Sequence, residues 1–139
     1  MVSDEVNHKI HHIVDKIESR ADSLARYEEY MTDDAEVLLF AYGSTARVAK
    51  ASVRTLRDEG IKAGLMRVKT IWPFSKKRLR ELLDQLKLIV VPEMNLGQYV
   101  LEVERAMCDE VPVKRLGRVD GHLFVPDQIS DFVRKEVGR

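Results

Sequence analysis

Two polar turns hold the residue types in this sequence that could bind a ligand or take part in a reaction. The first turn is Gly43, Ser44 and Thr45, which follows the apolar run from Val37 to Tyr42. Free backbone amides and hydroxyls at the start of a helix can hold a phosphate or a carboxylate, but we favour the commoner role, in which Ser44 or Thr45 only caps the helix. A dinucleotide-binding fingerprint is excluded, because it needs glycine where the chain has Thr45 and Val48.

The second turn follows the apolar run from Leu88 to Val91 and contains Glu93, Asn95 and Gln98. A carboxylate here could act as a general acid or base, or orient a proton-bearing group of a partner. We favour a structural interpretation, in which Glu93 accepts backbone amide hydrogen bonds or pairs with an arginine such as Arg47. Asn95 and Gln98 could bind the polar edge of a ligand, although helix capping explains Asn95 almost as well.

Three histidines, His8, His11 and His12, could bind a metal ion if Asp15 completed the set. They fall off the apolar stripe of their segment, however, and no HExxH pattern is present. A solvated helix face is the favoured interpretation, so no metal site is expected. No nucleophile has a base beside it, and Cys108 has no activating cation nearby, so no catalytic residue is predicted either.

The segment Trp72, Pro73 and Phe74 is an apolar loop that contains the only tryptophan. It could fold over the sheet, or its aromatic side chains could anchor a protein interface. Both alternatives stay open.

A basic cluster follows that loop, and it consists of Lys76, Lys77, Arg78 and Arg80. It could contact an acidic partner or a polyphosphate. We favour a solvated outer helix face, on which Glu81 and Asp84 balance the positive charge.

The composition restricts the class of protein. With 139 residues the chain has room for one domain, which we divide into a lead helix and linker over residues 1–34 and an α/β core over residues 35–139. Its 23 basic and 23 acidic residues give a formal net charge of zero, so no general attraction to nucleic acid is expected. The single cysteine excludes an internal disulfide and any metal cluster built from this chain's thiolates alone.

The location expected from the sequence is the cytoplasm. The apolar run from Val37 to Tyr42 is the longest, and it is far shorter than the roughly 20 residues of a membrane span. The first residues, MVSDEVNHK, lack the basic and apolar regions of a signal peptide. No membrane partner is expected.

Hydrophobic periodicity predicts an alternation of strands and helices. Strands are expected at residues 37–42, 61–68, 88–91 and 111–116, and helices at residues 4–30, 44–60, 75–86, 95–107 and 126–137. Such an alternation gives parallel strands joined by right-handed crossovers.

The strand order follows from which strands are most apolar. The strands at 37–42 and 88–91 are placed in the centre. The strand at 61–68 carries charged residues, and the strand at 111–116 carries Pro112, which cannot donate to a sheet, so both are placed at edges. The prediction is a three-layer, mainly parallel open sheet of order 2-1-3-4, with room for an extra edge strand. This order brings the two polar turns together at the carboxyl ends of the strands.

A resemblance to a known family rests on two stretches, AYGSTARVAKASVRTLRDEGIKAGLMRVKTIWPF and IVVPEMNLGQYVLEVERA. Both resemble the carboxy-terminal domain of the alpha subunit of 2-oxoacid:ferredoxin oxidoreductases, especially of the 2-oxoglutarate type, over residues 35–106. That domain is similar to the last domain of transketolase, in which a threonine, a proline stretch and a strand that ends in glutamate recur. The matching residues here are Thr70, Pro73 and Glu93.

The resemblance implies a role in a complex that oxidatively decarboxylates 2-oxo acids to acyl-CoA. Such complexes use thiamine diphosphate, magnesium, iron-sulfur clusters and CoA, and ferredoxin takes the electrons. The family's motifs for these cofactors are absent from this chain, so we expect a fragment or a separately encoded piece that is not catalytic alone. Its expected partners are the remaining alpha-subunit domain and the beta subunit, with gamma and delta subunits as further candidates. The isolated piece is expected to self-associate through uncovered apolar surface.

The alternative from another class is a stand-alone small-molecule-binding or regulatory α/β module. A phosphoacceptor receiver domain is a weaker third hypothesis, because it needs an aspartate at the end of the first strand, where this chain has Tyr42 and Gly43.

Overall fold

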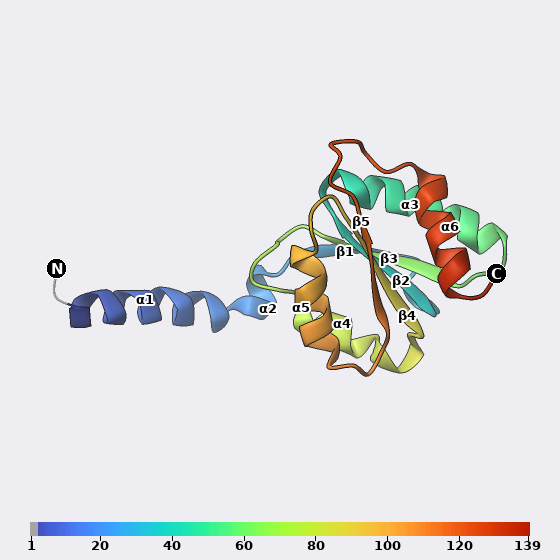
Figure 1. Cartoon of the computed structure of the whole chain (residues 1–139). Helices are drawn as coiled ribbons and strands as arrows, with labels where there is room; N and C mark the ends of the chain where they lie inside the picture. Colours follow the sequence, from blue (N-terminus) through green and yellow to red (C-terminus); the bar gives the residue numbers. More distant parts are fainter. Residues whose placement is uncertain (1–2) are drawn as a thin grey trace.

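The computed structural model describes residues 3–139, which form one mixed sheet with helices on both faces (Figure 1). The strands are β1 (Tyr27–Tyr30), β2 (Val37–Tyr42), β3 (Ala63–Val68), β4 (Leu88–Glu93) and β5 (Val113–Gly117). The helices are α1 (Ser3–Glu18), α2 (Ala21–Leu24), α3 (Gly43–Asp58), α4 (Lys76–Glu81), α5 (Gln98–Met107) and α6 (Pro126–Glu136), with the 3-10 helix η1 (Leu83–Gln85) after α4.

The sheet has the order β1-β3-β2-β4-β5, which confirms the predicted order of the four parallel strands. β2 pairs in parallel with β3 on one side and with β4 on the other, and β5 pairs in parallel with β4. β4 is buried along its whole length, and β2 is buried up to its last residue. This burial explains why both are continuously apolar, as expected for strands covered on both faces.

The predicted helix over residues 4–30 is wrong in its second half. α1 ends at Glu18, and after α2 the chain runs as β1, antiparallel to β3. The backbone of residues 27–30 pairs with the edge of β3 that β2 does not occupy. Their conformation is therefore set by a tertiary partner and not by their own periodicity. Because β1 pairs with β3, β3 is an interior strand of the sheet. The prediction that its charged residues place it at an edge is therefore wrong.

The two faces of the sheet carry separate cores. Along β2, the side chains of Val37, Leu39 and Ala41 pack in the core beneath α3 and α6, whereas Leu38 and Phe40 pack in the core beneath α4 and α5. This alternation is the two-residue period of a strand. Together the two cores fix the three layers.

The helix α1 lies outside these layers. It contains no buried residue, and it points away from the rest of the domain (Figure 1). Ile10 and Ile13 on its apolar stripe are 56% and 57% exposed. Most helical stability in proteins comes from packing of an amphipathic face, which α1 lacks among the described residues.

Substitution of Gly64 by alanine is expected to destabilise the domain by about 2 kcal/mol, because the interior there is already close-packed. A Cβ atom at this position would lie 2.6 Å from the carbonyl oxygen of Met31 and 2.9 Å from the Cβ of Ala35, and neither atom can move freely. Urea unfolding followed by circular dichroism measures the loss.

The control is Gly138→Ala, after α6, whose Cβ meets no atom within 4 Å. It should cost about 1 kcal/mol or less, because only the positive φ of 74° disfavours alanine there. Equal stability of the Gly64→Ala variant and the wild type would show that the Met31 turn does not constrain β3.

Candidate functional site

The two polar turns lie side by side at the carboxyl ends of β2 and β4, as the strand order requires. The Nδ2 of Asn95 donates a hydrogen bond of 2.7 Å to the hydroxyl oxygen of Tyr42. This bond joins residues that are 53 positions apart in the chain. The structure thus brings Gly43 and Ser44 close to the loop that begins after Glu93. In open α/β sheets this switch point is where ligands commonly bind.

Glu93 is the last residue of β4 and is only 1% exposed. Its Oε2 accepts a hydrogen bond from the backbone amide of Tyr99 at 3.1 Å, and its Oε1 accepts one from that of Val100 at 3.3 Å. Both amides belong to the first turn of α5, where the helix dipole also favours a negative charge. Glu93 therefore anchors α5, in agreement with the structural interpretation of this residue.

The arginine beside Glu93 is Arg115 rather than the predicted Arg47. The Nε of Arg115 lies 3.9 Å from Oε1 of Glu93, and its Nη2 donates a 2.6 Å hydrogen bond to the carbonyl oxygen of Asn95. The sequence could not indicate this pair, because β5 comes beside β4 only through sheet pairing. Arg47 lies exposed on α3 and forms no ion pair with the described residues.

Asn95 shapes its own loop. Its Oδ1 accepts hydrogen bonds from the backbone amides of Gly97 at 2.8 Å and of Gln98 at 3.2 Å. Gly97 has a φ of 106°, a conformation that suits glycine. With its Nδ2 bound to Tyr42, Asn95 has its side-chain groups engaged within the protein, whereas Gln98 and Leu96 are exposed.

Neither hydroxyl of the first turn caps α3, so the capping interpretation of Ser44 and Thr45 is wrong. The helix begins at Gly43, which has a φ of 58°, and the capping position falls on Tyr42. Ser44 and Thr45 therefore lie inside the first helical turn, where Thr45 is buried and Ser44 is exposed.

Aromatic side chains pack beneath both turns. The ring of Tyr99 lies 5.1 Å from that of Tyr42, 5.8 Å from that of Phe40 and 5.5 Å from that of Phe74, measured between centroids. Burial raises the pKa of the Tyr42 hydroxyl, the negative charge of Glu93 raises it further, and the hydrogen bond from Asn95 opposes both effects. Burial also raises the pKa of Tyr99.

The loop at residues 72–74 is partly buried and partly exposed. Pro73 is buried, and Phe74 packs 5.6 Å from Phe40 between ring centroids. Trp72 and its neighbour Ile71 are 55% and 48% exposed. The loop therefore covers the sheet with one half and presents large apolar side chains to solvent with the other.

The basic cluster is less solvated than predicted. Arg78 binds Glu29 of β1 at 2.5 Å as well as Glu81, and Arg80 binds Glu110 at 2.6 Å. Asp84 takes part in none of the ion pairs formed by the described residues, so the expected balance by Glu81 and Asp84 is only half right. These long-range pairs join α4 to β1 and to the end of α5.

The three histidines of α1 are exposed. Among residues 3–139, the structure contains no group of three or more histidine, cysteine, aspartate or glutamate side chains that could hold a metal ion. No helix in this part of the chain is long and apolar enough to cross a membrane.

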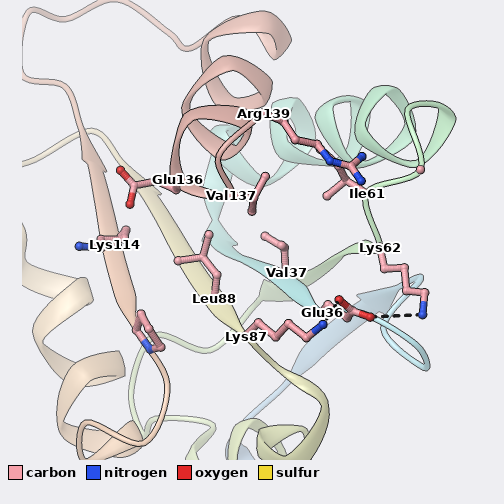
Figure 2. A pocket seen from close by; sticks show the side chains of 12 residues that line it. Glu36, Val37, Ile61, Lys62, Lys87, Leu88, Lys114, Glu136, Val137 and Arg139 are labelled. Atoms are coloured by element: carbon pink, nitrogen blue, oxygen red, sulfur yellow. Dashed lines mark hydrogen bonds and ion pairs between the residues drawn. The ribbon is translucent and has the colours of Figure 1, made fainter.

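A hollow of about 640 Å³ opens at the opposite, amino-terminal edge of the sheet (Figure 2). Apolar side chains of Val37, Ile61, Leu88 and Val137 line it. Among its charged side chains, Glu36 binds Lys62 at 3.2 Å and Lys87 at 2.6 Å. These two lysines therefore share one carboxylate, which lowers but does not cancel their positive charge.

The fold and the switch point define an open α/β domain in which the polar side chains of the second turn hold its own loop in place. Over residues 35–129 the chain matches the family described as pyruvate:ferredoxin oxidoreductase core domain II, and it belongs to this family.

Relatives and solved structures agree with this assignment. The chain is 32% identical over 121 residues to 2-oxoglutarate synthase subunit KorA of Methanothermobacter marburgensis, and 37% identical over 133 residues to ketoisovalerate oxidoreductase subunit VorB of the same organism. These matches cover 87% and 95% of this chain. The structure of 2-oxoglutarate:ferredoxin oxidoreductase from Magnetococcus marinus is similar with a TM-score of 0.76 and 25% identity, over 95% of this chain and 23% of that one.

A split-gene transketolase, an inactive beta4 tetramer, shares the fold with a TM-score of 0.69 at 20% identity, over 81% of this chain and 41% of that one. The chain spans about a third of the length of the curated relatives named above. It corresponds to one domain of 2-oxoacid:ferredoxin oxidoreductase subunits, as the sequence resemblance implied.

Replacement of Glu93 by glutamine is expected to lower the free energy of unfolding by about 2 kcal/mol, because hydrogen bonds to a buried charged group are lost. The amide group of glutamine can accept at only one atom, so one of the two α5 amides loses its acceptor. Chemical denaturation measures the change, and Glu104→Gln on the exposed face of α5 is the control. A loss no larger than in the control would contradict the anchoring role.

Replacement of Asn95 by alanine is expected to raise the pKa of Tyr42 further, because the phenolate loses a hydrogen-bond donor. Glu93→Gln is expected to lower it, since a nearby negative charge is removed. Carbon-13 NMR titration of tyrosine-labelled protein reads each ring separately. Gln98→Ala, a change in the same loop, should leave the Tyr42 titration in place. A shift of opposite sign in either variant would refute this description of the turn.

Proposed function

We propose that this chain is a docking domain of the alpha subunit, which supports the active-site domain of a complex that oxidatively decarboxylates a 2-oxo acid. The observation that carries the proposal is the position of the exposed apolar side chains. Those on the carboxyl-edge loops and the segments leading to them are Ile10, Ile13, Leu24, Ile71, Trp72, Leu96, Val119, Leu123 and Val125. Large apolar side chains exposed in such numbers are typical of protein interfaces.

The carboxyl edge supplies the centre of this surface. Leu96, on the loop after β4, is 78% exposed. Trp72 lies two residues before Phe74, whose ring packs against Tyr99 in the aromatic cluster. The loop after β5 begins at the same edge, since the backbone amide of Arg118 donates to the carbonyl oxygen of Glu93 at 3.1 Å. A large aromatic side chain surrounded by apolar loops is the usual anchor of an interface.

The exposed apolar stripe of helix α1 also supports a docking role. Its apolar stripe is uncovered, and the match to the ketoisovalerate oxidoreductase subunit covers 95% of the chain. That longer relative therefore has a sequence segment that corresponds to most of α1. We infer that α1 packs against polypeptide of the alpha subunit outside this domain.

The residues of this domain do not fit the family's cofactors. The single cysteine, Cys108, is exposed, and no metal-holding cluster exists within residues 3–139. An iron-sulfur cluster needs several thiolates. We infer that the clusters belong to the rest of the complex, which includes the remaining alpha-subunit domain and the beta subunit, and we propose the same for thiamine diphosphate, magnesium and CoA. Ferredoxin is an indirect partner, and the relatives support 2-oxoglutarate as the substrate class without excluding a branched-chain 2-oxo acid.

The stand-alone ligand-binding module is the weaker proposal. Glu93 and Asn95, its best polar candidates, are bound by the protein's own backbone and by Tyr42. A ligand at the switch point would have to replace these bonds, and burial of the displaced groups would cost free energy.

The double variant Trp72→Ser, Leu96→Ser is expected to weaken association with the remaining alpha-subunit polypeptide and the beta subunit by at least about tenfold, as loss of an aromatic interface anchor does. Isothermal titration calorimetry with the co-expressed partner polypeptides measures this affinity. The same variant should reduce self-association of the isolated chain, followed by light scattering.

The control is Leu101→Ser, Val137→Ser, which removes two exposed apolar side chains that lie elsewhere. It should change the affinity for the partner polypeptides and the affinity of self-association by less than about threefold, since scattered surface apolar residues contribute little. Equal effects of the two double variants would place the interface away from the carboxyl edge. Turnover of a 2-oxo acid by the isolated chain would overturn the non-catalytic role.

A further inference from the structure

Unbalanced positive charge gathers on one side of the domain, which we call the α3/β1 flank. It is formed by the exposed side chains of Arg26, Arg47, Lys50, Arg54, Arg67 and Lys69. Glu28 is the carboxylate that pairs with members of this flank. Because the whole chain has a net charge of zero, this excess is a segregation of charge and not a general property of the sequence.

Strand pairing brings half of the flank together. Glu28 of β1 lies opposite Arg67 of β3, and its carboxylate binds Arg67 at 3.2 Å and also binds Lys69. The backbone amide of Lys69 in turn donates to the carbonyl oxygen of Arg26 at 2.8 Å. One carboxylate is therefore shared by two cations, and Arg26 adds a third positive charge beside them.

The ring of Tyr30 connects the cations on α3 to those beside β1. Tyr30 is the last residue of β1, and the Nζ of Lys50 lies 4.7 Å from the centroid of its ring. Arg54 donates a 3.1 Å hydrogen bond to the Tyr30 hydroxyl oxygen. Arg47 lies on α3 about one turn before Lys50 and continues the stripe. None of the three α3 cations has a carboxylate partner among the described residues.

The basic cluster on α4 provides a contrast. There Arg78 and Arg80 are matched by Glu29, Glu81 and Glu110. On the α3/β1 flank, like charges lie close together and repel one another, a cost that an opposite charge from outside would remove. The flank runs along the outer surface of α3 and β1, and at Arg26 and Lys69 it borders the apolar segments that contain Leu24 and Ile71.

We propose that the α3/β1 flank is a docking surface for the acidic face of another protein. The charge is complementary to clustered carboxylates, which steer association and fix orientation. A nucleic acid fits less well for two reasons. The ring of Tyr30 is covered by Lys50 and Arg54, so it is not free to stack on a base. Glu28 sits among the cations, where it would repel a continuous phosphate backbone but could accept a hydrogen bond from a protein donor.

The test uses the 139-residue chain and a fluorescent polyglutamate peptide, with a single-stranded RNA of equal charge for comparison. Fluorescence anisotropy is measured at about 50 mM and about 200 mM salt, since such contacts weaken as salt rises. The flank variant is Arg47→Glu, Lys50→Glu, Lys69→Glu. The control variant is Lys9→Glu, Lys76→Glu, Lys135→Glu, which changes the net charge equally at exposed lysines elsewhere.

We expect the peptide to bind in a salt-sensitive way and more tightly than the RNA. The flank variant should weaken peptide binding at least tenfold, whereas the control variant should change it by less than threefold. Carbodiimide cross-linking of the unaltered chain to the peptide should label Lys50 and Lys69 before Lys76 and Lys135, and this readout does not depend on how the variants fold. Absence of peptide binding at low salt, equal losses in the two variants, stronger binding of RNA, or cross-links spread evenly over the lysines would each overturn the proposal. Because no partner subunit takes part, these outcomes are independent of the assembly role.

Discussion

The buried carboxylate of Glu93 is the constraint on which the carboxyl edge depends. It stands at the end of the central strand β4, holds two backbone amides of α5, and lies beside Arg115 of the edge strand β5. One charged group thus connects a strand, the helix that follows it and a neighbouring strand. A buried carboxylate without these donors would carry a large desolvation cost, so the loop, the helix start and the strand pairing must form together.

Because of this arrangement, the polar groups at the switch point contact the protein itself. In many open α/β proteins the polar groups at that position face a ligand. Here Asn95 is engaged with Tyr42 and with its own loop, and Glu93 is closed off from solvent. What remains exposed includes the large apolar side chains of Leu96 and Trp72, beside the polar side chains of Ser44 and Gln98. The same geometry that serves binding of small molecules in other proteins therefore presents a rigid, apolar surface, which suits contact with another polypeptide.

Positive charge and apolar surface occupy adjoining parts of the domain. The carboxyl-edge loops carry exposed apolar side chains, the α4 side is balanced by long-range ion pairs, and the α3/β1 flank keeps an excess of positive charge. Such a domain can contact other polypeptides both through apolar surface and through charge. Apolar burial gives stable assembly, whereas a basic flank gives fast and salt-sensitive encounters.

The sequence alone indicated the parallel core and its strand order, because the continuous apolar runs at Val37–Tyr42 and Leu88–Val91 are typical of strands buried on both faces. The family was indicated separately, by the resemblance of two stretches of the sequence. The sequence also indicated that Glu93 has a structural role. Only the tertiary structure decided that residues 27–30 form β1, that Arg115 and not Arg47 lies beside Glu93, and that positive charge collects along α3. The reason is physical: local periodicity reports which face of an element is buried, whereas the partner of an edge strand or of a charged side chain is set by long-range pairing, which leaves no regular pattern in the sequence.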